Sequence, residues 1–171
     1  GWSVFYAKAG QPGGALQIWR ATPFEAGWIT ERLTSGDQHQ TQLVTTSLTR
    51  TGTRVLNIRG TWSNGTMTWF SEGDPDDEHP IIEIDDTVFG RTPARWSRDG
   101  RSVLYRDELA RVNLFDADLG TQRLITDDGD QHDDPNGWPA PEVDGEMLVA
   151  TVVNGTHIAI LRDLGAPTWK G

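Results

Sequence analysis

The sequence predicts an all-β protein built as a β-propeller of about four blades, each blade a sheet of four antiparallel strands. Three stretches repeat one plan: a short strand, a tight turn that closes on glycine, and then a second strand rich in β-formers. The turn glycines are Gly52, Gly100 and Gly145, which lie 48 and 45 residues apart. A period near 45 residues is typical of propeller blades, which stack because no blade can bury its faces alone. Helix signals are nearly absent, and the one ambiguous run, Asp107–Val112, is too short to change the class.

The repeat divides the 171-residue chain into units at roughly 1–42, 43–86, 87–134 and 135–171. Together they form a single propeller domain or a propeller fragment. The first unit opens directly on its second strand, and the last keeps at best a stub of its fourth strand, at 167–170. Because open sheet edges invite pairing, we expect missing blades to complete the ring. A self-contained four-bladed ring and a larger ring made by two chains are the alternatives.

The strands of the first two units are expected between turn-forming segments. They lie at 2–8, 15–21 and 28–34, and then at 44–48, 54–59, 67–71 and 81–84. The Gly- and Pro-rich segment 9–14 separates the first pair of strands. Asn64-Gly65 predicts a tight hairpin, because Asn-Gly readily adopts positive φ angles. The acidic segment 73–79 is expected to be a loop.

The last two units follow the same plan. Their strands are expected at 94–96, 102–106, 111–116 and 121–126, and then at 137–141, 147–153 and 157–162. Asp118-Leu-Gly120 predicts one of the turns between them, and Asn154-Gly155 predicts another.

Composition restricts the partners. The formal net charge is −10, which argues against nucleic acid and against anionic membranes, because both need a basic face. An acidic sugar polymer could still bind through a local cluster of Arg and His. No apolar run approaches the ~20 residues of a membrane-spanning helix. The chain has no cysteine, which says little about its compartment.

The aromatic residues are unusual in type, with eight Trp against two Tyr. Most of these rings are expected to fill the space between sheets, where aromatic side chains bury a large area. One or two of them could instead form a platform on which a sugar ring stacks.

Two phrases resemble a known repeat. Ser97-Arg-Asp-Gly100, followed after one residue by Ser-Val-Leu-Tyr, closely resembles the "SPDG" repeat of TolB-like propellers. Arg123-Leu-Ile-Thr-Asp127 and Arg32-Leu-Thr-Ser-Gly36 resemble the linker of the same repeats. The resemblance implies the fold but no single activity, since such propellers include binding proteins, peptidase domains and polysaccharide lyases.

A second, local resemblance narrows the range of expected functions. The segment from Arg32 to Gln42, with its Gly-Asp-Gln-His39 phrase, looks like the His-rich linker of oligogalacturonate and ulvan-type lyases, and the phrase recurs at Gly129-Asp-Gln-His132. In those families the resemblance implies β-elimination at a uronic acid, with His and Tyr as acid and base. Some members hold a metal with His and Gln, but the tight His cluster of those members is missing from this sequence. Such a substrate implies an extracellular or periplasmic location.

The chemistry then selects candidate residues. A lyase neutralises the uronate carboxylate, removes the proton at C5 and protonates the leaving O4. The first task needs cationic or amide donors, and the two proton transfers need groups with a movable proton. The catalytic candidates are His39 and Tyr105. The substrate-binding candidates are Gln40, Gln42, Arg59, Arg95 and His132.

A dense run of carboxylates surrounds the second His. Asp128, Asp130 and Asp133 are candidate ligands of Ca²⁺ or another divalent metal, because hard cations prefer clustered oxygen ligands. A solvated acidic loop is the other interpretation, since the run lacks the ordered spacing of an EF-hand. The alternative to a lyase is a non-catalytic TolB-like propeller that binds a protein or a glycan, and a peptidase-associated propeller comes third.

Overall fold

The computed structural model describes residues 2–36, 45–49, 52–60, 64–85, 94–107, 109–139 and 147–163. Within these residues the protein is all-β, with strands and turns and no helix. It follows that no helix of the described chain is long and apolar enough to cross a membrane.

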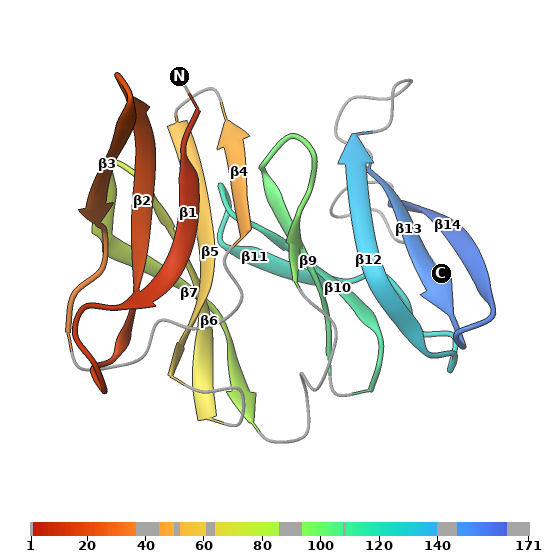
Figure 1. Ribbon diagram of the computed structural model, residues 1–171. Coiled ribbons are helices and arrows are strands. Elements are labelled where there is room, and N and C mark those ends of the chain that lie inside the picture. Colours follow the sequence, from red (N-terminus) through yellow and green to blue (C-terminus); the bar gives the residue numbers. More distant parts are fainter. Residues whose placement is uncertain are drawn as a thin grey trace. The chain divides into compact units, whose positions relative to one another are not determined.

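The strands form four antiparallel sheets, each of which joins consecutive strands in chain order (Figure 1). The first sheet contains β1 (Val4–Ala9), β2 (Leu16–Phe24) and β3 (Gly27–Arg32). The second contains β4 (Thr45–Thr49), β5 (Gly52–Gly60), β6 (Asn64–Ser71) and β7 (Asp74–Asp85). The third contains β8 (Arg95–Trp96), β9 (Ser102–Arg106), β10 (Val112–Asp116) and β11 (Thr121–Leu124). The fourth contains β12 (His132–Pro139), β13 (Met147–Val153) and β14 (His157–Asp163).

The grouping into four successive sheets confirms the order of strands expected from the repeat. As predicted, the first and fourth sheets have three strands in the described residues, and the two between them have four. No sheet closes on itself. The all-β class and the four-sheet organisation are therefore observed, whereas closure into a propeller remains a prediction.

The chain forms two compact units, Gly1–Asp86 and Thr87–Gly171, and each contains two sheets. In the first unit the two sheets share a core of Ile18, Leu33, Val55 and Phe70, flanked by Phe5 and Ala7. In the second unit the core consists of Leu104, Val112, Leu114 and Val149, flanked by Ile125 and Leu161. Both cores are aliphatic and aromatic layers between facing sheets, which is the usual way in which sheets bury their apolar side chains.

The Ser97-Arg-Asp-Gly100 phrase is a turn held by its own side chains. Asp99 accepts hydrogen bonds from Ser97 Oγ, at 2.5 Å, and from the backbone N–H of Arg101, at 3.2 Å. The Ser97 hydroxyl also accepts a bond from the backbone N–H of Ser102, where β9 begins. Short polar side chains that bond nearby backbone groups favour turns, so the phrase has a structural role.

The Asn154-Gly155 turn between β13 and β14 is confirmed. Both residues have positive φ angles, 48° and 64°, as a primed hairpin turn requires. The turn predicted at Asp118-Leu-Gly120 is also present, between β10 and β11.

Two predictions of local structure were wrong. First, Asn64 and Gly65 lie inside strand β6, where Gly65 pairs with Gly60 of β5. The ambiguous run before β10 forms no helix in its described residues, because Asp107 accepts hydrogen bonds from the backbone N–H groups of Leu109 and Arg111 in a turn.

The second wrong prediction concerns the acidic segment 73–79, most of which belongs to β7. This strand pairs with β6 through two register irregularities, at Met67/Thr68 and at Trp69/Ser71. It lies at the edge of its sheet, where Pro75 and Pro80 need no inward N–H and where acidic side chains face solvent. Residues that usually signal a loop are thus compatible with an edge strand.

Tryptophan has both of the expected environments. Trp69 and Trp96 are buried, and Trp69 stacks on His79 of the neighbouring strand with ring centroids 4.3 Å apart. Trp2 and Trp28 are exposed and meet edge to face at 5.2 Å. Packing therefore accounts for some of these rings, while Trp2 and Trp28 lie on an open surface.

Candidate functional site

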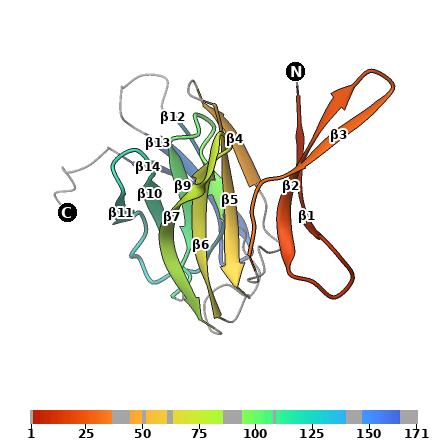
Figure 2. The same ribbon diagram turned by 90° about the vertical axis from the view of Figure 1, so that its left-hand side faces the viewer.

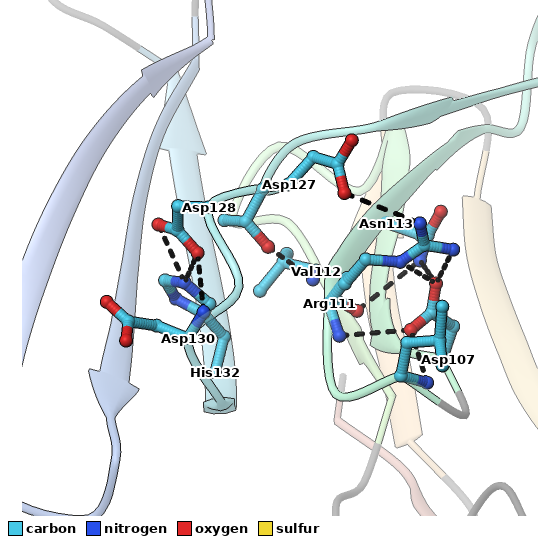
Figure 3. Close-up of polar contacts among 10 residues, drawn as sticks. Asp107, Arg111, Val112, Asn113, Asp127, Asp128, Asp130 and His132 are labelled. Carbon is cyan, nitrogen blue, oxygen red and sulfur yellow. Dashed lines mark hydrogen bonds and ion pairs between the residues drawn. The ribbon is translucent and has the colours of Figure 1, made fainter.

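The second Gly-Asp-Gln-His phrase forms a turn that fixes its histidine inside the fold. Nε2 of His132 lies 3.0 Å and 3.2 Å from the two carboxylate oxygens of Asp128, and the ring is 1% exposed (Figure 3). The backbone N–H of His132 donates to the carbonyl of Ala110. The hydrogen bond with His132 is the main reason that the pKa of Asp128 lies below its usual value.

The same turn is attached to the next hairpin. The backbone N–H of Gln131 donates to Asn154 Oδ1 at 3.0 Å, and Asn154 Nδ2 donates to Asp130 at 2.9 Å. These bonds join the entry of β12 to the β13–β14 turn. In this position His132 holds the turn in place, and its ring offers no open surface to a substrate.

The three predicted metal ligands have separate partners. Asp128 bonds His132, Asp130 bonds Asn154, and Asp133 forms an ion pair with Arg106. Across the part of the chain that the structure describes, no group of three or more His, Cys, Asp or Glu side chains is arranged to hold a metal ion. The arrangement of these carboxylates matches the interpretation as a polar turn better than that as a Ca²⁺ site.

Tyr105 lies in the core of the second unit. Its side chain on β9 is fully buried, and burial raises its pKa well above the usual value, with a smaller contribution from the negative charge of Asp107. The phenol therefore stays protonated across the physiological range. Its burial gives a substrate no access to the hydroxyl in this structure.

Asp107 itself organises the neighbouring turn. Its carboxylate accepts hydrogen bonds from Arg111 Nε, at 2.9 Å, and from Asn113 Nδ2, at 3.0 Å (Figure 3). Partial burial would raise its pKa, but the bonds from Arg111 and Asn113 outweigh that effect and lower it. The guanidinium of Arg111 also lies 3.6 Å from Asp127, so two acidic side chains of this loop share one cation.

The two predicted substrate arginines lie in different units. Arg59 of β5 pairs with Glu78 at 2.9 Å in the first unit, where burial raises the pKa of Glu78 and Arg59 opposes that shift. Arg95 is exposed on β8 in the second unit. The remaining predicted residues, His39, Gln40 and Gln42, lie outside the described residues, and their roles stay predictions.

A hollow of about 570 Å³ lies between the two sheets of the first unit. Its charged lining residues are Arg20, Glu31, Arg32, Glu72 and Asp74. Arg20 bridges the first sheet to the second, because its guanidinium bonds both Glu31 and Glu72. These two bonds, that with Glu72 first, raise the pKa of Arg20 and keep it charged.

The hollow also presents uncharged polar groups, Thr53 and Ser71, and glycine backbone at Gly52 and Gly73. Sequence reasoning missed this site. Its residues come from β2, β3 and the ends of β5, β6 and β7, and no motif links them. Only the packing of the two sheets brings them together.

Comparison with known proteins does not assign a family to this chain. No family model matches it, and no curated protein matches it.

Proposed function

We propose that this chain is a non-catalytic module of β-propeller type that binds a carbohydrate through the hollow of its first unit. Two observations support the propeller. Four meander sheets follow one another along the chain. In addition, consecutive residues of the central strands β5, β6, β9 and β10 are buried, so both faces of these strands are covered. Such burial is expected of internal blades in a stack.

The lining of the hollow carries the proposal of carbohydrate binding. Its volume of about 570 Å³ lies within the usual ligand-site range of roughly 300–1,000 Å³. Arginine supplies N–H donors, and carboxylates supply acceptors, so neighbouring side chains of both kinds can bond the hydroxyl groups of one sugar. The Arg20–Glu31–Glu72 bridge holds some of these groups in fixed positions, which reduces the entropy lost on binding.

The charge of the hollow indicates the kind of sugar. Two arginines face three carboxylates there, namely Glu31, Glu72 and Asp74. Because acidic groups are in excess, a neutral hydroxylated sugar fits better than a polyuronate. The proposed site therefore differs from that of a lyase, whose substrate would be a uronate polymer.

We propose a non-catalytic module because the two described candidates for an acid or base, Tyr105 and His132, are inaccessible to a substrate. Tyr105 is fully buried and His132 is 1% exposed, where a general acid or base needs to reach the substrate within hydrogen-bond distance. Both side chains instead support the second unit from within.

The experiment is a titration of the protein with neutral oligosaccharides and with polygalacturonate, followed by calorimetry. We expect binding of a neutral oligosaccharide, weakened roughly 5-fold by Asp74→Asn or by Thr53→Val, because a single lost hydrogen bond is worth about 1 kcal/mol. Asp76→Asn is the matched control, since Asp76 is exposed on the same strand but does not line the hollow. The proposal fails if no neutral sugar binds, or if the three variants bind equally.

A polysaccharide lyase is the second candidate, and the Gly-Asp-Gln-His39 phrase is the observation that favours it. In β-elimination a base removes the C5 proton, the C5 electron pair forms the C4–C5 double bond, and O4 leaves with a proton. The unsaturated product absorbs ultraviolet light. Incubation with polygalacturonate or ulvan should then raise the absorbance, and His39→Ala should abolish the rise. If the absorbance stays constant with every uronate polymer, the lyase candidate is ruled out and the non-catalytic module remains.

A further inference from the structure

The hollow of the first unit contains more acidic side chains than its own arginines can neutralise. It lies between the first sheet, which contains β2 and β3, and the second sheet, which contains β5, β6 and β7 (Figure 2). Two arginines and three carboxylates line it, which leaves one negative charge in excess. How these charges are paired decides which ligand the hollow can hold.

One guanidinium serves two of the three acids. Arg20 Nη1 donates to Glu72 Oε1, and Arg20 Nη2 donates to Glu31 Oε2. The other oxygen of each carboxylate takes part in no hydrogen bond or ion pair within the described residues. Since the two nitrogens belong to one planar group, they also hold the two acids side by side. Arg20 therefore fixes two acceptor oxygens in place without occupying them.

The third acid, Asp74, has no partner of its own. Asp74 and the second arginine, Arg32, are both exposed, and neither side chain bonds another of the residues that the structure describes. Asp74 begins β7, directly after the turn that contains Glu72 and Gly73. A Cβ atom at Gly73 would meet no atom within 4 Å, so the space next to this turn is open. A ligand can therefore reach the carboxylate of Asp74.

The open groups of the hollow are mostly acceptors. A carboxylate only accepts hydrogen bonds, and each of the three acids still has at least one oxygen to offer. A sugar hydroxyl donates one hydrogen bond, whereas an ammonium group donates three and accepts none. The ammonium also adds the positive charge that the hollow lacks, and charges attract more strongly in a partly enclosed site than in bulk water.

We propose that the ligand of the hollow is an amino sugar whose ammonium group is bound by Asp74 together with the two carboxylates that Arg20 holds. This inference rests on the carbohydrate binding proposed above and adds the class of sugar. The formal net charge of −10 acts in the same direction over a longer range, because it attracts a cationic oligosaccharide and repels a polyuronate. Arg32 opposes the ammonium, and its N–H groups are donors for the hydroxyl oxygens of the sugar.

The test compares two ligands that differ only in the group on C2. These are a β-1,4-linked glucosamine tetramer and the corresponding glucose tetramer. Calorimetry at about pH 5.5, above the usual pKa of Asp and Glu and below that of an amine, gives a Kd for each. We expect the glucosamine tetramer to bind roughly 10-fold more tightly, because hydrogen bonds between charged groups are stronger than those between neutral groups. The ratio of the two Kd values is called the amine preference below.

Three substitutions in the hollow should change binding in different ways. Asp74→Asn keeps the shape of the side chain but removes its charge, so the amine preference should fall to roughly 2-fold. Arg32→Gln removes a positive charge that opposes the ammonium, so the amine preference should rise. Thr53→Val removes an uncharged hydroxyl, so it should weaken both tetramers alike and leave the preference unchanged.

Asp76→Asn is the matched control. It removes the same charge from an exposed position on the same strand, outside the hollow, and should leave the amine preference unchanged. A tetralysine peptide with blocked ends has the same charge as the glucosamine tetramer but no sugar rings, and it should bind more weakly. Circular dichroism checks that each variant folds. Raising the salt concentration from about 0.05 to about 0.5 M needs no substitution, and it should reduce the amine preference of the unaltered chain because salt screens charge.

The outcomes separate this inference from the proposed function. If the two tetramers bind equally well, carbohydrate binding stands and the amine preference is wrong. If neither tetramer binds, both proposals fail. An amine preference that persists unchanged in Asp74→Asn overturns the inference, because the attraction would then come from acids outside the hollow. A tetralysine peptide that binds as tightly as the glucosamine tetramer also overturns it, since charge alone would then explain the binding.

Discussion

His132 Nε2 and a carboxylate oxygen of Asp128 lie within hydrogen-bonding distance across a single turn, 3.0 Å apart, with the ring buried and the acid half exposed. The pair closes the turn that leads into β12, and the backbone N–H of Asp130 donates to the same carboxylate at 3.1 Å. A phrase that resembles a lyase motif thus acts in this structure as a turn with its own internal partner. The other copy of the phrase, which ends at His39, lies outside the described residues.

The first prediction concerns pH. The folded-state pKa of Asp128 is lowered, chiefly by His132, so this carboxylate stabilises the fold above its unfolded pKa and stops doing so as pH falls through the folded value. Asp128→Asn should cost about 0.5–1 kcal/mol at neutral pH, because the acid is half exposed. The difference in stability should begin to shrink below about pH 4, the unfolded value, and vanish only below the lower folded-state value. Urea unfolding between neutral and acid pH measures this, with Asp76→Asn as the control. A constant difference at every pH would contradict the assignment.

The second prediction concerns the turn before β10. Asp107→Ala should destabilise the protein by about 1–3 kcal/mol, because it removes the acceptor of four hydrogen bonds, two of them from backbone N–H groups. Asp107→Asn should cost less, since an amide oxygen can still accept the backbone bonds. Denaturant midpoints of the two variants give the ranking. Equal costs would show that the negative charge, and not the backbone bonds, is what matters.

The third prediction compares two glycines. At Gly155, with φ of 64° and open space around it, alanine should cost about 1 kcal/mol through the backbone alone. Alanine at Gly60 should cost more, because its Cβ would lie 2.6 Å from the carbonyl oxygen of Asn64 in addition to adopting a φ of 106°. Gly27→Ala is the control, with open space and no positive φ. Thermal unfolding should rank the losses in the order Gly60, Gly155, Gly27.

The fourth prediction separates core from surface with the same substitution. Phe70→Ala should cost about 3–5 kcal/mol, because Phe70 is fully buried in the core of the first unit. Phe24→Ala should change stability by less than about 0.5 kcal/mol, since Phe24 is 56% exposed. Chemical unfolding of the two variants measures both losses. Similar losses at both sites would mean that the hairpin tip is covered in solution.

Local patterns predicted most of the strands. The expected strand 102–106 matches β9, and 147–153 matches β13, because β-branched runs between turn residues carry their own signal. The signal failed at β7, where Asp, Glu and Pro occur in an edge strand and mimic a loop. It failed again at Asn64-Gly65, where the strand pairing with Gly60 prevailed over the local preference for a turn.

The candidate sites were predicted far less well. Residue type and motif selected Tyr105 and His132, but burial decides whether such groups can act, and burial depends on neighbours distant in sequence. The Arg20–Glu72 bridge is the converse case, a feature of the site that residue type and motif did not predict. Its two members lie 52 residues apart and belong to no motif, so only the meeting of two sheets could reveal them.

The sequence by itself determined the all-β class, the repeat of about 45 residues and the division into four sheets. These properties follow from glycine turns, Asp-capped turns and β-rich runs, which act within a few residues of one another. The tertiary structure alone decided which side chains are accessible. It placed the Tyr105 ring in a core, joined Arg20 to two acids around a hollow, and left the rings of Trp2 and Trp28 uncovered. Accessibility is a property of how sheets face one another, and no stretch of a single strand contains it.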